Sequence, residues 1–359
     1  MEFSLNLPIN SVSFGQVSLA LLREIYRRGL NPSLLPYGNV DISTSKEDPL
    51  FVEWLNKCIL KFKQFHTRDI PVIKLWHLSG SHESISKKQI LISFYELDSP
   101  TLYEQNVAKG NVTVFTSKFT KEIFNKFGIE THFIPLGFDS NTFSNLNRQF
   151  FDDGRITFNV CGKLERRKNQ IKVIKSWLKK FGNNKKYSLQ ACCYNSFLSK
   201  EMNAKIITEA LEGNRYFNFN NLEWIPKNET YNEFLNSADV VIGMSSGEGW
   251  AIPEFSSVAI GKHAVILNAH AHQVWANEKN SILVDPVQEK IDCYDNIFFK
   301  KGAEINQGQY FNYDDDQFIT ACEEVIKRVE ANRVNEEGLK LQTEFTYEKT
   351  VDKLLELLN

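Results

Sequence analysis

Residues 246–263 combine a glycine-rich stretch with an acid and a predicted helix start. The stretch reads Ser-Gly-Glu-Gly-Trp-Ala-Ile-Pro-Glu-Phe-Ser-Ser-Val-Ala-Ile-Gly-Lys-His and follows the apolar run 240–244, which predicts a buried strand. Pro253 suits the first turn of a helix, and glycines let the backbone approach a ligand closely. Because the N–H groups and the dipole of a helix start favour anions, this order predicts a phosphate site. Glu248 is better suited to sugar hydroxyls, so the stretch predicts a site for a phosphate ester that carries a sugar.

A second stretch, residues 161–169, places four cations within six residues. It reads Cys-Gly-Lys-Leu-Glu-Arg-Arg-Lys-Asn, which indicates a strand end, a turn and a helix start. Lys163 and Lys168 would hold a pyrophosphate by charge-assisted hydrogen bonds. A solvated basic turn is the alternative. The position of the stretch, at the first strand–helix turn of the domain that also holds residues 246–263, favours the binding function.

Other polar residues are candidates because of their place at predicted strand ends. Glu96 follows the predicted strand 89–95 and would bind an acceptor hydroxyl or act as a base, with a solvated loop acid as the alternative. His77 ends another strand and either faces the ligand site or is a structural histidine. His270 and His272 resemble a metal-binding pair, but no third ligand has suitable spacing. We expect one of these two histidines to line the ligand site.

Short apolar strands alternate with amphipathic helices along the whole chain. The first series holds expected strands at 3–7, 72–78, 89–95, 112–116 and 132–136, and expected helices at 16–28 and 120–127. The second series holds expected strands at 156–161, 187–193, 240–244, 263–267 and 281–284, and expected helices at 169–181, 197–211, 230–237, 253–260 and 316–332. This alternation predicts an α/β fold with parallel sheets covered by helices on both faces.

Two such series predict two doubly wound Rossmann-like domains that face a cleft, with ligands at the carboxyl ends of the strands. The length of 359 residues also exceeds what one core usually supports. The polar stretch 141–153 is the expected boundary. We therefore expect an N-terminal domain at 1–150 and a C-terminal domain at 151–340. Residues 341–359 are expected to form a last helix, with a return to the N-terminal domain as one option.

The composition is that of an ordinary globular protein, with 42% hydrophobic residues and a net charge of −2, which argues against a nucleic-acid binder as a whole. Six cysteines match neither a zinc site nor a disulfide framework. Cys161, Cys192 and Cys193 lie in apolar runs and predict buried, reduced thiols, as in a cytoplasmic protein. The N-terminus lacks signal-peptide features, and no stretch of about 18 apolar residues predicts a membrane helix. The motifs of dinucleotide-binding dehydrogenases, P-loop proteins and α/β-hydrolases are missing.

Several stretches resemble glycosyltransferase family 4, a group of retaining enzymes with the GT-B fold. Gly-Lys-Leu-Glu-Arg-Arg-Lys-Asn at 162–169 resembles the family's Gly-Arg-Leu…Lys-Gly element. Glu-Gly-Trp-Ala-Ile-Pro at 248–253 resembles Glu-Gly-Phe-Gly-Leu-Pro, and Gly-Lys-His-Ala-Val-Ile at 261–266 resembles Gly-Thr-Pro-Val-Ile. Weaker matches occur in order at residues 133–139, 231–240 and 344–347. The resemblance spans roughly 90–358 and is strongest over 156–270.

The resemblance implies a nucleotide-diphosphate sugar donor, a UDP- or GDP-sugar, bound mainly by residues 151–340, with the acceptor on the N-terminal side and no metal or other cofactor. Lys163 and Lys168 match the two family cations that bind the diphosphate. Glu248 matches the first of two family glutamates and lies near the transferred sugar. The backbone N–H groups of the next four residues would lie beside that sugar and the diphosphate: Gly249, Trp250, Ala251 and Ile252.

Three further assignments follow from the resemblance, each with an alternative. The second family glutamate, which holds the ribose, falls on Ser256 here. Glu254 would take over that contact only with a shifted or rotated helix start; otherwise it favours the helix dipole. Gly15 lies in a loop that is glycine-rich in the family and faces the donor, or else in an ordinary turn. Trp224 lies where the family flanks the nucleotide base, or else packs in the core.

We therefore expect a retaining glycosyltransferase, a hexosyl- or pentosyltransferase, with Glu248, Glu96 and His77 as catalytic residues. The acceptor would carry a hydroxyl, as in a glycan, a lipid, a small molecule or a modified DNA base. A sugar phosphorylase or a sugar-phosphate synthase of the same fold is one alternative. A non-catalytic relative that binds a nucleotide sugar or a partner is another, and Ser256 keeps it open.

Overall fold

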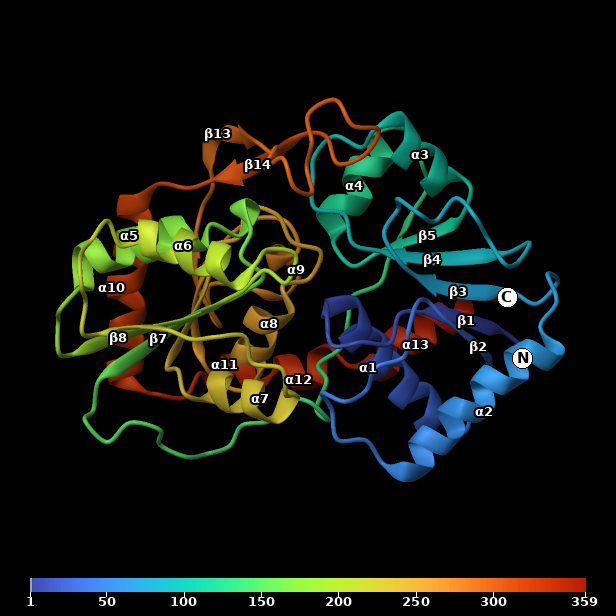
Figure 1. The fold of residues 1–359 in the computed structure, drawn as a ribbon, viewed down its shortest axis with the longest axis horizontal. Helices are drawn as coiled ribbons and strands as arrows, with labels where there is room; N and C mark the ends of the chain where they lie inside the picture. The colour runs from blue at the N-terminus through green and yellow to red at the C-terminus, as the bar shows by residue number, and fades with distance from the viewer. Residues whose placement is uncertain (1) are drawn as a thin grey trace. The chain divides into compact units, whose positions relative to one another are not determined.

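The computed structural model describes residues 2–359, which form two compact units (Figure 1). Unit 1 is built from the chain up to Asn141, from Asn296–Gly308 and from Thr343–Asn359. Unit 2 is built from Thr142–Asp295 and Gln309–Gln342. Each unit contains a six-stranded parallel sheet with flanking helices, so the α/β class and the two doubly wound sheets predicted from the sequence are confirmed.

The sheet of unit 1 has the strand order β2-β1-β3-β4-β5-β6. Its strands are β1 (Ser4–Leu7), β2 (Ser33–Pro36), β3 (Val72–Leu75), β4 (Gln89–Ser93), β5 (Val112–Phe115) and β6 (His132–Phe133). Its helices are α1 (Ser13–Arg27), α2 (Pro49–Phe65), α3 (Leu102–Lys109), α4 (Lys118–Lys126) and α13 (Tyr347–Glu356). Strands β1, β3 and β4 are buried along their whole length, as expected for central parallel strands.

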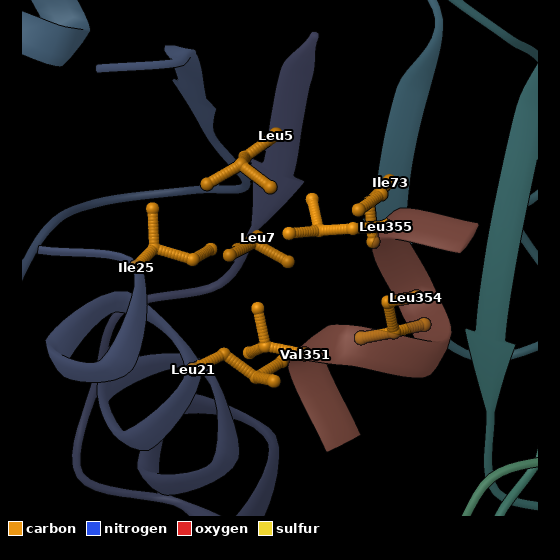
Figure 2. Close-up of a pocket in the computed structure, with 8 residues that line it drawn as sticks. All are labelled: Leu5, Leu7, Leu21, Ile25, Ile73, Val351, Leu354 and Leu355. Atoms are coloured by element: carbon orange, nitrogen blue, oxygen red, sulfur yellow. The ribbon is translucent and has the colours of Figure 1, made fainter. Parts of the chain in front are cut away.

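The C-terminal helix α13 packs beside α1 over β1 and β3 (Figure 1). Figure 2 shows apolar side chains of these elements around a small void: Leu5, Leu7, Leu21, Ile25, Ile73, Val351, Leu354 and Leu355. The backbone N–H of Phe138 also donates to the Phe345 carbonyl oxygen at 2.8 Å. Gly137 permits this close approach, because a Cβ atom there would lie 2.0 Å from the backbone nitrogen of Tyr347.

Residues Asn296–Gly308 also pack in unit 1, beside the start of α3. The backbone N–H of Asn306 donates to Glu104 at 2.8 Å, and the Thr101 hydroxyl donates to the Glu304 carbonyl oxygen at 2.6 Å. Burial raises the pKa of the Glu104 carboxyl, although its hydrogen bonds to backbone N–H groups act in the opposite direction. The strands on either side of this segment, β13 (Val287–Asp292) and β14 (Gln309–Asn312), pair antiparallel.

The sheet of unit 2 has the strand order β12-β11-β10-β7-β8-β9. Its strands are β7 (Ile156–Gly162), β8 (Tyr187–Cys193), β9 (Phe219–Asn221), β10 (Val240–Gly243), β11 (His263–Leu267) and β12 (Ile282–Val284). Its longer helices are α5 (Gln170–Phe181), α6 (Lys200–Ala210), α7 (Asn228–Asn236), α8 (Ile252–Ala259) and α10 (Asp315–Ala331). Its short helices are η1 (Arg166–Lys168), α9 (His272–Trp275) and α11 (Glu336–Leu339), and α12 (Leu341–Glu344) leads into unit 1.

Helices α5 and α10 cover one face of this sheet and complete its main core, where Trp177 and Phe318 are fully buried. Helix α8 packs against β10 and β11, and α7 packs against α8. Asp314 caps α10, since its carboxylate accepts from the backbone N–H of Gln317, and the helix lies within one residue of the predicted range 316–332.

All six cysteines are buried and free. Within residues 2–359, no cluster of histidine, cysteine and acidic side chains is arranged to hold a metal ion. Over the same residues, no helix is both long and apolar enough to span a membrane.

Candidate functional site

Two loops of unit 2 meet at the carboxyl edge of its sheet. The cation loop, residues 163–169, follows β7, and the glycine loop, residues 244–251, follows β10. Strands β7 and β10 are paired neighbours, and the strand order reverses between them. In open parallel sheets this point of reversal is where ligands bind, because the two loops diverge to opposite faces and leave a crevice.

Lysine and glutamate side chains connect the two loops. Lys168 Nζ lies 2.5 Å from Glu248 Oε1, and both side chains are largely buried. Gly162, at the end of β7, lies beside the Lys168 side chain, and its φ of 102° is a backbone conformation that favours glycine. Lys163 is more exposed and its Nζ lies 2.6 Å from Glu165 Oε1. The stretches 161–169 and 246–263 therefore meet at one edge of the sheet and are joined by an ion pair between Lys168 and Glu248.

Arg167 contacts both the cation loop and the glycine loop. Its guanidinium donates to the Gly247 carbonyl oxygen at 2.5 Å and lies 3.0 Å from Glu165 Oε2 and 3.4 Å from Glu248 Oε1. Its own carbonyl oxygen accepts from the backbone N–H of Ser246 at 2.7 Å. Arg167 was not predicted as a site residue, since a run of basic residues is typical of a solvated turn. Its contacts with Glu248 and Gly247 join residues about 80 positions apart, so no local pattern indicates them.

Asn169 adds a second connection between the loops. Its side-chain amide donates to the Met244 carbonyl oxygen at 2.8 Å and to the Ser246 hydroxyl at 2.6 Å. Asn169 adopts a left-handed conformation with a φ of 56°, which asparagine tolerates better than most residues. The cation loop thus turns sharply at Asn169 before α5 begins.

The charges in this cluster control the protonation of its two buried glutamates. Burial opposes ionisation of Glu248, but the nearby Lys168 ammonium and Arg167 guanidinium outweigh it and hold the pKa of Glu248 well below its usual range. Burial raises the pKa of Glu254 to about 7, with Lys168 acting against the shift and Glu248 adding to it. While Glu254 is protonated, the three cations Lys163, Arg167 and Lys168 face two carboxylates, so the cluster attracts anions.

Glu254 lies in the first turn of α8 and is 3% exposed. Its Cγ atom packs over Gly243 at the end of β10, where a Cβ atom would come within 2.9 Å. Its Oε2 atom has no hydrogen-bond partner among the described residues. Ser256 is also buried, further along α8. The ribose contact of either residue stays a prediction.

Helix α8 begins directly at the glycine loop. Ala251, the residue before the helix, has a left-handed backbone with a φ of 65° and a ψ of 60°. Pro253 stands in the first turn, as predicted from the sequence. Trp250 is buried and contacts Phe255, and its carbonyl oxygen accepts from the Trp275 indole N–H at 3.0 Å. Its side chain therefore packs in the protein interior, while Gly249 lies in the glycine loop and Ile252 is the first residue of α8.

His270 and His272 are buried near this cluster rather than arranged around a metal. Burial and the neighbouring His272 lower the pKa of His270 to about 3, so its ring is neutral. The His272 Nδ1 atom lies 2.9 Å from the Leu267 carbonyl oxygen. Burial also lowers the pKa of His272, although the Glu248 carboxylate acts in the opposite direction.

The remaining predicted residues lie elsewhere. Trp224 is 52% exposed and faces the Tyr194 ring, so the alternative that it packs in the core is wrong. Gly15 lies inside the first turn of α1 and not in a loop before it, because α1 begins at Ser13. A Cβ atom on Gly15 would lie 2.2 Å from the Asn10 carbonyl oxygen, so this glycine allows a tight turn into the helix. Glu96 and His77 lie in unit 1, after β4 and β3.

No family model matches the sequence, and a search of curated proteins found no similar sequence. Solved structures are similar over almost the whole chain. A sucrose-phosphate synthase from Thermosynechococcus elongatus is 13% identical with a TM-score of 0.65, over 99% of this chain and 98% of that one. A UDP-forming α,α-trehalose-phosphate synthase from Burkholderia vietnamiensis is 10% identical with a TM-score of 0.66, over 99% and 96%.

A glycosyltransferase from Rickettsia africae is similar to the same degree, with 12% identity, a TM-score of 0.66 and coverage of 99% of this chain and 97% of that one. At such low identity these similarities show the fold and not the activity. Together with the two doubly wound sheets, they show that the chain has the GT-B fold of two Rossmann-like domains.

Proposed function

We propose that this protein is a glycosyltransferase that moves a sugar from a nucleotide-diphosphate sugar to a hydroxyl acceptor. The observation that carries the proposal is the contact between Lys168 and Glu248 at the point of strand reversal. A cation for the diphosphate and an acid for the sugar hydroxyls thus stand side by side, next to the start of α8. The names of the similar structures, which include UDP-forming synthases, favour a UDP-sugar as the donor.

The proposed reaction breaks the bond between the anomeric carbon and the oxygen of the β-phosphate. Negative charge then builds on the departing diphosphate, where Lys168, Lys163 and the N–H groups at the start of α8 stabilise it. Positive charge builds on the sugar ring in an oxocarbenium-like state. When the diphosphate takes the Lys168 ammonium, the Glu248 carboxylate is left to accept hydrogen bonds from sugar hydroxyls. Glu248 would therefore orient the transferred sugar.

We also propose transfer with retention of anomeric configuration and without a metal ion, as the resemblance to family 4 implies. Lysines 163 and 168 supply the positive charge that a metal ion would otherwise bring to the diphosphate. Glu96 and His77 are proposed to act on the acceptor from unit 1. Proton NMR of the product measures its anomeric configuration, and activity after treatment with EDTA tests the metal. The proposed location is the cytoplasm.

Binding of free nucleotides tests the donor site. We expect UDP to bind and raise the melting temperature, with GDP and ADP as comparisons. The Lys168→Ala substitution removes a charge-assisted hydrogen bond, so it should weaken the Kd for UDP at least tenfold by calorimetry. Lys175→Ala, on an exposed lysine of α5 in the same unit, is the matched control and should bind UDP like the unchanged protein.

A second variant separates a lost ligand contact from lost folding, since Lys168→Ala leaves Glu248 buried without its lysine. Glu248→Gln keeps Lys168 and removes its carboxylate partner. This variant should still bind UDP while its rate of sugar transfer or donor hydrolysis falls at least a hundredfold. If neither UDP nor GDP nor ADP binds to the unchanged protein, the proposed donor site is wrong.

A sugar-phosphate synthase is the second candidate function, favoured by the names of the sucrose- and trehalose-phosphate synthases among the similar structures. The donor chemistry would be the same, and the acceptor would be a phosphorylated sugar. Transfer to glucose 6-phosphate or fructose 6-phosphate, but not to the free sugars, would select this candidate. Donor binding without hydrolysis or transfer would instead favour a non-catalytic relative, the alternative that Ser256 keeps open.

A further inference from the structure

Aromatic side chains gather at the carboxyl edge of the unit 1 sheet. Tyr37 follows β2, Trp76 and His77 follow β3, and Phe94 follows β4, while Phe14 comes from the first turn of α1. We call these five residues the aromatic patch. Three of the six strands of the sheet thus deliver a ring to the same edge.

The rings of the patch contact one another in a continuous series. Tyr37 and Trp76 have ring centroids 4.0 Å apart with an angle of 32° between their planes. Phe14 lies at the centre of the other contacts, 5.8 Å from Trp76, 4.5 Å from His77 and 4.8 Å from Phe94. Such contacts hold the rings in fixed positions.

The patch is not an ordinary part of the core, because most of it reaches the surface. Only Phe14 is buried; Tyr37, Trp76 and Phe94 are half-buried and His77 is exposed. Below them, the buried Lys74 ammonium donates to the carbonyl oxygens of Gly80 and Glu83 at 3.2 Å each. Exposed aromatic groups beside polar residues are typical of ligand sites.

The patch also stands at the point where a doubly wound sheet binds ligands. In the order β2-β1-β3-β4-β5-β6, the strand order reverses between β1 and β3. Phe14 follows β1 at the start of α1, and Trp76 and His77 follow β3. The aromatic patch therefore occupies in unit 1 the same topological position that the cation and glycine loops occupy in unit 2.

We propose that the aromatic patch binds a sugar, which is the acceptor if the proposed glycosyltransferase function holds. A pyranose ring presents an apolar face of C–H groups and an edge of hydroxyls. The first would stack on Trp76 or Tyr37, which support each other, and the second would reach His77 and Glu96, the acid that follows Phe94 by two residues. The geometry thus selects a glycan or small sugar from the four acceptor classes that the sequence leaves open.

Charge and shape disfavour the other classes. Glu96 and Asp98 place two carboxyl groups just after β4, which oppose the phosphates of a nucleic acid or an anionic lipid. A nucleobase also stacks on aromatic rings, so a nucleic acid is the main competitor and forms one arm of the test. An acyl chain would need a long apolar groove, whereas these rings form a patch with polar neighbours.

Ligand-observed NMR tests the proposal without knowledge of the true acceptor. Saturation-transfer spectra of maltose, cellobiose and chitobiose, each with the unchanged protein, should show binding of at least one sugar. Tyr37→Leu and Trp76→Leu should each weaken the Kd for that sugar at least tenfold, which corresponds to about 1.4 kcal/mol. Phe65→Leu, on an exposed aromatic residue at the end of α2 in the same unit, is the matched control and should leave sugar binding unchanged.

UDP binding is measured on the same variants. It should stay within twofold of the unchanged protein, which shows that the variants fold and that the patch does not serve the donor. Where transfer is measurable, the variants should raise the acceptor KM much more than they lower kcat.

The outcomes separate this proposal from the donor site. If sugars bind in a Trp76-dependent way but none of UDP, GDP and ADP binds, the sugar site stands and the glycosyltransferase function fails. If UDP binds and no sugar is affected by Tyr37→Leu or Trp76→Leu, the sugar site is wrong. A single-stranded oligothymidylate that binds through Trp76 where no sugar does would overturn the proposal in favour of a nucleobase.

Discussion

At the scale of single residues, two buried acids near Lys168, Glu248 and Glu254, have pKa values shifted in opposite directions. Glu248 pairs directly with Lys168, which keeps its carboxyl group ionised. The Glu254 Oε2 atom has no hydrogen-bond partner among the described residues, and the pKa of Glu254 is raised to about 7. A carboxylate without a partner is costly in a protein interior, so the neutral form is favoured until solution pH approaches that value. The two acids must therefore make opposite contributions to the pH dependence of stability.

The Glu254→Gln substitution tests this difference. The folded protein holds the Glu254 proton up to about pH 7, while the unfolded chain releases it near pH 4.5. Between these values the unfolded state binds fewer protons, so this group lowers the free energy of unfolding as pH rises, by about 3 kcal/mol in total. Glutamine does not titrate, so the variant should gain stability relative to the unchanged protein from pH 5 to pH 8.

Urea unfolding at several pH values measures this relative gain. Glu122→Gln, on an exposed acid of α4, is the control and should show a flat difference across the same range. A flat difference for Glu254→Gln as well would mean that Glu254 is ionised in the folded protein. An ionised Glu254 would be a third carboxylate and would balance the three cations Lys163, Arg167 and Lys168.

In the charge cluster around Lys168 and Glu248, the residues that belong to local motifs were predicted from the sequence, and those that depend on tertiary burial were missed. Lys168 and Glu248 were predicted from local patterns of glycine, charge and helix start, and the structure brings them together. Arg167 was missed because three successive basic residues suggest a solvated turn, and only the fold around Gly247 and Glu165 buries the middle one. Trp224 was left between two interpretations because one aromatic residue carries no periodicity.

At the scale of elements, Ala251 marks a strained entry into helix α8. Its left-handed backbone costs an L-residue with a Cβ atom about 1 kcal/mol, and glycine avoids that cost. Ala251→Gly should therefore stabilise the unliganded protein by up to about 1 kcal/mol, less the extra freedom that glycine brings to the unfolded chain. The midpoint of urea unfolding measures the change.

Ala204→Gly is the control, and the opposite change in stability is expected for it, because Ala204 is an exposed residue inside α6. Glycine there should cost about 1 kcal/mol, as in other helix interiors. If Ala251→Gly destabilised the protein as much as Ala204→Gly, the left-handed entry into α8 would not exist in solution.

Most of the longer elements were predicted, but the 17-residue helix α2 and helix α3 were not. Strands β8 and β11 have the predicted bounds, because most of their residues are apolar. The strand predicted at 72–78 ends three residues early, at Leu75, and the next two residues, Trp76 and His77, belong to the aromatic patch. Strand β2 was missed because it has four residues and ends at a proline.

At the scale of the whole molecule, unit 1 is formed by chain segments that lie far apart in the sequence and contact one another. The chain enters this unit three times, in its N-terminal part, at Asn296–Gly308 and at Thr343–Asn359. The middle segment is held by hydrogen bonds to Thr101 and Glu104, which are about two hundred positions away. Local patterns carry no signal of such pairings, so the sequence predicted the two sheets but not this segment. The three entries make unit 1 depend on its C-terminal residues.

Gly137 is the residue through which this dependence is most directly tested. The Gly137→Ala substitution places a Cβ atom only 2.0 Å from the Tyr347 backbone nitrogen, so the start of α13 must move. Movement of α13 would also disturb the apolar contacts of Val351 and Leu354 with β1 and α1 that Figure 2 shows. We expect a loss of about 3 kcal/mol or more, in the upper range for overpacked sites.

Hydrogen exchange measures where the loss falls. In Gly137→Ala the amides of α13 should exchange faster, while those of β7 and β10 in unit 2 should keep their rates, because the substitution touches neither strand. Gly110→Ala is the matched control: it also adds one methyl group in unit 1, but the nearest atom would lie 3.4 Å away. It should leave both exchange and stability nearly unchanged. Equal protection of α13 in both variants would mean that the C-terminal helix does not depend on the close approach at Gly137.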